Sequence, residues 1–231
     1  MKAPMSVLIG YSTCPVSYAA FDRRGHVVAT CDLRPATHGG VHLRCDIWTA
    51  LRAHPWDMAI LHPMCTYLTV SAAWAFADPD FGRYPDGGYH QRVRPGTLTG
   101  KARREARREA LENFRRLLAL PFPVAIENPG RSFLSTAIRP PDQLVHPYEF
   151  GDDASKLTGF WLVGLPSLAI DPARRCGGRW VEWPRGSGRM VERWANQTDG
   201  GQNALGPADD RWIERSATYP GIAEAMGETW G

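Results

Sequence analysis

Two short apolar runs joined by a long helical pattern constrain the fold more than any other feature of this chain. Residues 57–61 and 122–127 each have the length of a strand. Between them, residues 101–120 repeat apolar side chains at helical spacing, with arginines and glutamates on the other face, until Pro121 and Pro123. A strand, a helix and a second strand form a crossover unit with parallel strands. The sequence therefore predicts an α/β protein in which this helix is scaffold and its arginines are solvated.

Reactive side chains follow both apolar runs. The first run is followed by His62-Pro63-Met64-Cys65, and the second ends in Glu127-Asn128-Pro129. Carboxyl ends of parallel strands meet at the sheet edge where ligands bind, and the prolines stiffen both turns. A thiol and a carboxylic acid in one crevice suit attack on a heteroaromatic ring that is protonated or hydrogen-bonded. Taken alone, the first run is equally consistent with a buried structural cysteine.

The N-terminal part has the pattern of a nucleotide-binding unit. A strand at 6–10, a turn, a helix and a strand at 26–31 are followed by Asp32, where an acid accepts from ribose hydroxyls in such units. A loop-capping acid is the simpler alternative. With a further strand at 157–163, the expected fold is an α/β, doubly wound, mostly parallel sheet.

Composition divides the chain into a core and an appendage. The 231 residues, 43% apolar and 22% charged, suit a core at 1–170, a small irregular basic lobe at 171–210, and a segment at 211–231 that packs back on the core. No apolar run approaches the roughly 20 residues of a membrane span, and no signal peptide is recognised, so we expect a cytoplasmic protein without a membrane partner. The five cysteines contain no Cys-x-x-Cys pair, so neither a disulfide framework nor a metal site is predicted.

The lobe combines basic and aromatic residues in the manner of a nucleic-acid surface. Its arginines alternate with tryptophans, which suits phosphate contacts and base stacking. The alternative is a surface insertion whose tryptophans pack on the sheet. The candidate nucleic-acid contacts here are Arg179, Arg185, Arg189, Gln202 and Asn203. The Gly- and Pro-rich loop at 77–100 is predicted to be a lid or binding loop, with disorder as the alternative.

These motifs resemble those of a known family. Pro63-Met64-Cys65, with Glu127-Asn128-Pro129 about sixty residues later, is similar to the Pro-Pro-Cys and Glu-Asn-Val signature of the C5-cytosine DNA methyltransferases. The segments 62–69, 142–151, 154–158 and 215–223 resemble the short phage and prophage branch of that family, so the resemblance runs nearly end to end. It implies a Rossmann-like fold of the S-adenosylmethionine-dependent methyltransferase type, acting in the cytoplasm of a bacterial host cell.

The resemblance also implies an activity. The Cys65 thiolate adds to C6 of a flipped-out cytosine in DNA, and a carbon group passes from S-adenosylmethionine to C5. Glu127 protonates or hydrogen-bonds N3, which requires a raised pKa, and Pro63 and Asn128 complete the catalytic set. The cofactor contacts implied are Tyr11, Ser12, Thr13, Asp32, Asp46 and Ser216. Further DNA contacts are Thr66, together with Lys156 and Thr158 in place of the family's arginine-bearing strand.

The first loop departs from the family. Ser12, Cys14 and Pro15 stand where its members carry a glycine-rich turn, and the acid usual in the short branch is absent. Two alternatives therefore stay open. One is a DNA cytosine C5-modifying enzyme that uses a different one-carbon donor or an S-adenosylmethionine derivative, and the other is a catalytically silent DNA-binding relative. A monomer is expected.

Overall fold

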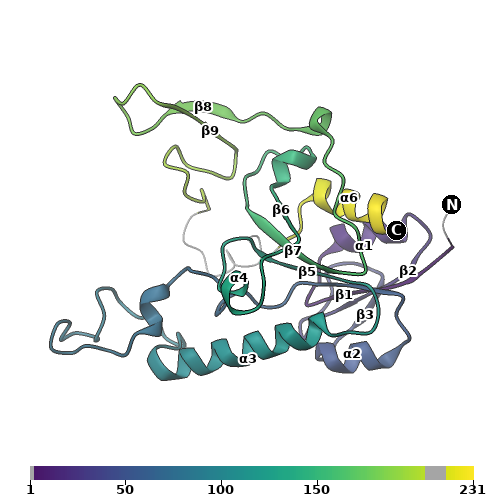
Figure 1. Ribbon diagram of the computed structural model, residues 1–231, viewed down its shortest axis with the longest axis horizontal. Helices are drawn as coiled ribbons and strands as arrows, with labels where there is room; N and C mark the ends of the chain where they lie inside the picture. Colours follow the sequence, from purple (N-terminus) through teal and green to yellow (C-terminus); the bar gives the residue numbers. More distant parts are fainter. Residues whose placement is uncertain (1–2, 206–216) are drawn as a thin grey trace.

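A seven-stranded sheet forms the centre of the computed structural model, which describes residues 3–205 and 217–231 (Figure 1). Its strands are β1 (Ser6–Gly10), β2 (Val27–Cys31), β3 (Val41–Leu43), β4 (Met58–Leu61), β5 (Val124–Pro129), β6 (Gln143–Val145) and β7 (Thr158–Val163). Their spatial order is β3-β2-β1-β4-β5-β7-β6. Neighbours among β1 to β5 are parallel, whereas β7 is antiparallel to both β5 and β6. The predicted α/β fold with a mostly parallel sheet is confirmed, and it is compatible with a Rossmann-like arrangement.

Helices cover both faces of this sheet (Figure 1). They are α1 (Pro15–Asp22), α2 (Ile47–Ala53), α3 (Gly100–Leu118), α4 (Leu134–Ala137) and α6 (Pro220–Trp230). Three 3₁₀ turns lie at Ala73–Phe76, Pro147–Phe150 and Pro172–Arg174. The five strands predicted from the sequence are present, but β3 and β6 were missed because three residues show no periodicity. The chain leaves β6 at Val145 and forms a 3₁₀ turn from Pro147, whose ring fixes φ near the helical range.

Alternation along the strands divides the core between the two faces. In β1, Val7 and Ile9 pack with the α1 and α6 side, whereas Leu8 packs with Phe114 and Leu117 of α3 on the opposite side. All five are fully buried. Successive strand residues point to opposite faces, so continuous apolar strands are required here. The order changes direction between β1 and β4, and this is the point where ligands bind in open α/β sheets.

The lobe is more regular than the sequence indicated. Residues 179–193 contain an antiparallel hairpin, β8 (Arg179–Glu182) and β9 (Met190–Arg193), so the prediction of an irregular lobe was wrong. Four cross-strand pairs supply the order that composition does not reveal. Trp180 and Trp183 are 64% and 42% exposed, so neither packs on the central sheet.

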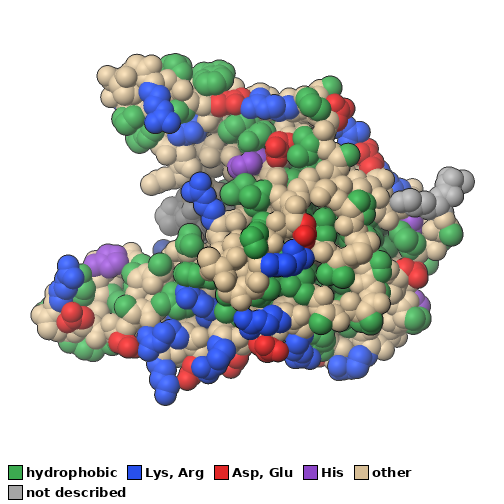
Figure 2. All heavy atoms as spheres, in the orientation of Figure 1, with side chains coloured by type: hydrophobic (Ala, Val, Ile, Leu, Met, Phe, Trp, Pro, Cys, Tyr) green, Lys and Arg blue, Asp and Glu red, His purple; other side chains and the backbone are tan. Residues whose placement is uncertain are grey.

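Two arms project from the same side of the molecule. One is the β8–β9 hairpin at the upper left of Figure 1, and the other is the loop between Phe76 and Gly100 at the lower left. Figure 2 shows an open hollow between them, with basic side chains on both arms. The second arm follows β4 in the chain, so it begins at the edge of the sheet where β4 ends. Within the described residues, no helix has the length and apolar character needed to cross a membrane.

Candidate active site

The turns after β4 and β5 are in direct contact. Leu61 and Ile126 are partners in the parallel register, so His62 and Glu127 follow side by side. His62 Nδ1 lies 3.0 Å from Glu127 Oε2. Asn128 Nδ2 donates to the Pro63 carbonyl oxygen over 2.9 Å, and Asn128 is only 3% exposed. The structure thus joins the cysteine turn to the acid turn, as the strand pattern predicted.

Glu127 lies between two basic side chains. Lys156 Nζ is 3.7 Å from Glu127 Oε1, opposite the His62 contact, and the Glu127 side chain is 12% exposed. Burial raises the pKa of Glu127, but the His62 hydrogen bond and the Lys156 charge outweigh it and lower the pKa to about 2. The expectation of a raised pKa was therefore wrong, because it took no account of these two neighbours. Glu127 is a carboxylate at neutral pH.

Backbone hydrogen bonds hold the loop that carries Cys65. The carbonyl of half-buried Cys65 accepts from the amides of Leu68 and Thr69. The Leu68 carbonyl in turn accepts from the Phe133 amide over 2.7 Å, and Thr69 forms an isolated bridge with Ser132. These bonds at Leu68 and Thr69, just after Cys65 in the chain, therefore join the loop after β4 to the loop after β5.

Two arginines of α3 also hold this loop. Arg103, 4% exposed, donates to the Thr66 carbonyl over 3.2 Å, and Arg107 donates to the Tyr67 carbonyl over 3.2 Å. The Arg107 guanidinium also stacks against the rings of Phe76 and Phe133. The prediction that these arginines are solvated was wrong, because the chain after Cys65 folds back over α3.

We expect Arg103→Ala to destabilise the protein by about 2 kcal/mol, because it removes buried packing and a donor to the Thr66 carbonyl. Arg108→Ala on the exposed side of the same helix is the control, with a change within about 0.5 kcal/mol. Urea unfolding at neutral pH measures both. Equal stability of the two variants would refute a structural role for Arg103.

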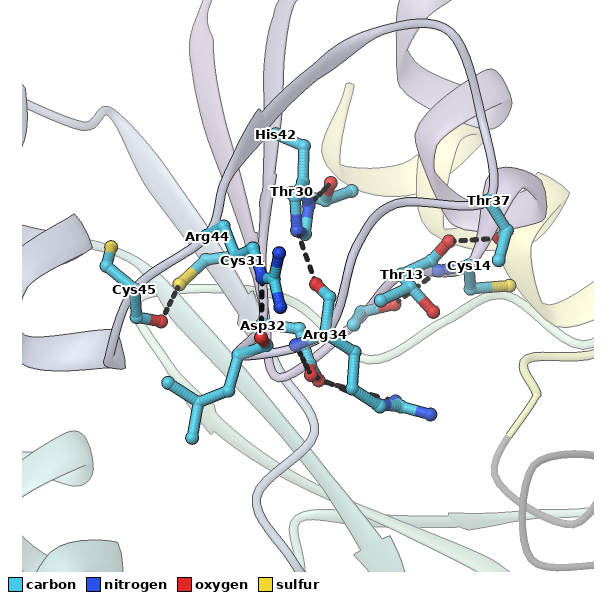
Figure 3. Close-up of polar contacts among 12 residues, drawn as sticks. Thr13, Cys14, Thr30, Cys31, Asp32, Arg34, Thr37, His42, Arg44 and Cys45 are labelled. Atoms are coloured by element: carbon cyan, nitrogen blue, oxygen red, sulfur yellow. Dashed lines mark hydrogen bonds and ion pairs between the residues drawn. The ribbon is translucent and has the colours of Figure 1, made fainter. Parts of the chain in front are cut away.

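The first loop satisfies its polar groups within the chain. The Ser12 amide donates to the Cys31 carbonyl and the Cys14 amide to the Ser12 hydroxyl, while Pro15 has no amide hydrogen. Figure 3 shows the Thr13 carbonyl facing Thr37, whose amide and hydroxyl both donate to it. Tyr11 has a φ of +58°, and its hydroxyl accepts from Asn113 Nδ2.

The two candidate cofactor acids are engaged as well. Asp32 accepts from the backbone and guanidinium of Arg34, as Figure 3 shows, and this is the loop-capping arrangement. Asp46 is the N-cap of α2 and accepts from the amides of Trp48 and Thr49. The methionine end of S-adenosylmethionine carries a charged amine and a carboxylate. The first loop has no carboxylate to pair with the amine, and the Ser12 and Cys14 amides already donate within the chain. Its residues therefore do not fit that end of S-adenosylmethionine.

The predicted DNA contacts fall into three groups. Thr66, Arg185, Arg189, Gln202 and Asn203 are exposed, as a DNA contact requires. Lys156 lies beside Glu127, and Arg179 pairs with Asp199 over 2.8 Å within the lobe. Thr158 is 1% exposed, and its hydroxyl donates to the Lys156 carbonyl, so its side chain belongs to the core. Ser216, which was predicted to contact the cofactor, lies outside the described residues.

Sequence reasoning gave no role to His62, Arg103 or Arg107. A signal for His62 existed, since it follows β4 at the position level with Glu127 in a parallel register. For the arginines there was none, because a buried and a solvated arginine look alike in a helical pattern.

No protein-family model matches the chain, and no curated protein matches it.

Proposed function

We propose that this protein is a DNA cytosine-modifying transferase of the C5-cytosine methyltransferase type, with Cys65 as the nucleophile. The contact between the cysteine turn and the Glu127 turn on adjacent parallel strands carries the proposal. Few reactions need a thiol and a carboxylate held together at this edge of a sheet, and addition to a pyrimidine ring is one of them.

The site chemistry differs in one respect from the expectation. Glu127 is ionised, so it accepts a hydrogen bond from the 4-amino group of cytosine as it approaches the N3 edge. Asn128 Oδ1 is buried without a hydrogen-bond partner among the described residues and is a second acceptor beside it. Two adjacent acceptors favour a ring that carries an exocyclic amine over one that carries a carbonyl.

The two projecting arms favour a DNA substrate. Arg185 and Arg189 are exposed in the hairpin, and Arg83, Arg92 and Arg94 are exposed on the opposite arm. Cationic side chains on both sides of a hollow match a polyanion that lies between them (Figure 2). Exposed Trp180 and Trp183 supply planar surfaces for an unstacked base.

The test is incubation with DNA and S-adenosylmethionine, digestion to nucleosides and mass spectrometry. A new mass on deoxycytidine, absent with Cys65→Ala, is expected and identifies the transferred group. Unchanged nucleosides with every donor tested, together with DNA affinity equal in wild type and Cys65→Ala, would instead indicate a silent DNA-binding relative.

A second candidate keeps the nucleophile but changes the donor. The first loop favours it, since Asp32 is bound by Arg34 and Pro15 lacks an amide hydrogen. This enzyme would transfer a different one-carbon unit, or a group from an S-adenosylmethionine derivative, to C5. Covalent trapping of cytosine without consumption or binding of S-adenosylmethionine supports this candidate, and methylcytosine formation excludes it.

The double variant Arg185→Ala/Arg189→Ala is expected to weaken DNA binding on all sequences. If both arginines contact phosphates, the slope of log K against log salt falls by roughly 2. The control is Arg174→Ala, because the Arg174 guanidinium is already paired with Glu228 of α6. Fluorescence anisotropy over a salt series measures the slopes, and an unchanged slope in the double variant would remove the hairpin from the interface.

A further inference from the structure

We propose that His62 is the proton-relay residue of this site: it passes a proton through the Glu127 carboxyl group to N3 of the bound cytosine as Cys65 attacks C6. This inference rests on the proposed function. It supplies the acid that an ionised Glu127 does not provide by itself.

The geometry of His62 favours a relay over an anchoring role. Its side chain is 13% exposed, and Nδ1 contacts Glu127 Oε2 over 3.0 Å. Its Nε2 is buried without a hydrogen-bond partner among the described residues. His42 is a contrast within the same chain, because both of its nitrogens are bonded, to Thr30 and to the Arg34 carbonyl. His62, in contrast, directs its Nδ1 at the Glu127 carboxylate.

The charges around Glu127 come from three elements. His62 follows β4, Glu127 lies in β5, and Lys156 precedes β7. Lys156 Nζ is also 5.9 Å from the ring centre of Tyr219, which lies ahead of α6. Lys156 is 3.7 Å from the carboxylate, beyond a short hydrogen bond, whereas His62 is at hydrogen-bond distance. His62 is therefore the better donor.

The step balances in atoms and electrons. The Cys65 thiolate electron pair forms the S–C6 bond, the C5=C6 pair becomes C4=C5, and the C4=N3 pair takes a proton at N3. The His62 imidazolium gives a proton to the Glu127 carboxylate, which passes it to N3, so the imidazolium becomes neutral imidazole and Glu127 ends as a carboxylate. The enamine then takes a proton (a deuteron in D₂O) from solvent at C5, and loss of the original C5 proton to solvent regenerates the enamine. Elimination of the Cys65 thiolate then restores the C5=C6 and C4=N3 bonds, and the N3 proton returns through Glu127 to His62. No donor of a carbon group takes part in this cycle.

The cycle predicts hydrogen exchange at C5 without any cofactor. Wild-type protein and a cytosine-containing oligonucleotide are incubated in D₂O, and deuterium at C5 is measured by mass spectrometry from acid to alkaline pH. The expected profile of exchange rate against pH is bell-shaped. The rate rises with pH as the Cys65 thiolate forms, and it falls at higher pH as the imidazolium is lost. His62→Gln should lower the maximum rate about 100-fold and lose the high-pH falling limb. Imidazole added to His62→Ala should restore part of the rate.

Matched variants separate the outcomes. His54→Gln, an exposed histidine after α2, should keep the wild-type profile. Lys156→Gln should keep the falling limb, and its disappearance in that variant would overturn the relay in favour of lysine. A wild-type profile without a falling limb overturns the relay even if the His62 variants fail to fold. Exchange that is unaffected by His62→Gln refutes the relay alone, whereas no Cys65-dependent exchange in wild type refutes the proposed function itself.

Discussion

Cys65→Ala is expected to abolish covalent trapping of DNA that contains 5-fluorocytosine. Fluorine at C5 cannot leave as a proton, so an enzyme that has added its thiolate to C6 stays attached once a group has been transferred to C5. The modification rate on ordinary cytosine should fall on the order of 10⁴-fold or more, because no second nucleophile takes over. Denaturing electrophoresis with labelled DNA and a supplied donor measures the adduct.

The control for this variant is Cys176→Ala. Cys176 is another half-buried thiol, but it lies in the lobe, and its backbone rather than its sulfur contacts Tyr148 and Trp194. This variant should trap DNA as wild type does. An adduct that persists in Cys65→Ala would assign the nucleophile elsewhere, and DNA binding should be unchanged in both variants.

Glu127→Gln is expected to flatten the acid limb of the stability curve. The pKa of Glu127 falls from 4.5 to about 2 on folding, so its ionised form stabilises the native state at pH values above the unfolded pKa. That stabilisation is lost as pH falls from about 4.5 towards 2. Its full size is about 3 kcal/mol, from 1.36 kcal/mol per pKa unit, and glutamine does not titrate. Wild type should therefore lose more stability than the variant in this window.

Urea unfolding at a series of pH values from neutral to acid measures the difference. Glu109→Gln, an exposed substitution on α3, is the control. Its unfolding free energy should depend on pH as that of wild type does. The difference in unfolding free energy between wild type and Glu127→Gln should shrink as pH falls, because protonated Glu127 is as neutral as glutamine. A difference that is constant with pH would mean that His62 and Lys156 do not hold the carboxylate ionised.

Much of this architecture could be predicted from local sequence. The apolar runs at 6–10 and 57–61 can be recognised because buried parallel strands need side chains on both faces, and the α3 pattern because one face meets the core. Parallel strands place their carboxyl ends together, so the contact between the Pro63 turn and Asn128 also followed from the pattern. These features depend on spacing within short segments.

The sequence by itself thus determined the α/β class, five of the strands and the meeting of the two reactive turns. Only the tertiary structure decided the charge state of Glu127, the burial of Arg103, and the use of Asp32 and Asp46 in local bonds. The physical reason is that a pKa or a burial depends on groups distant in the chain, as Lys156 is from Glu127. Local periodicity carries no record of such neighbours, and they exist only once the chain has folded.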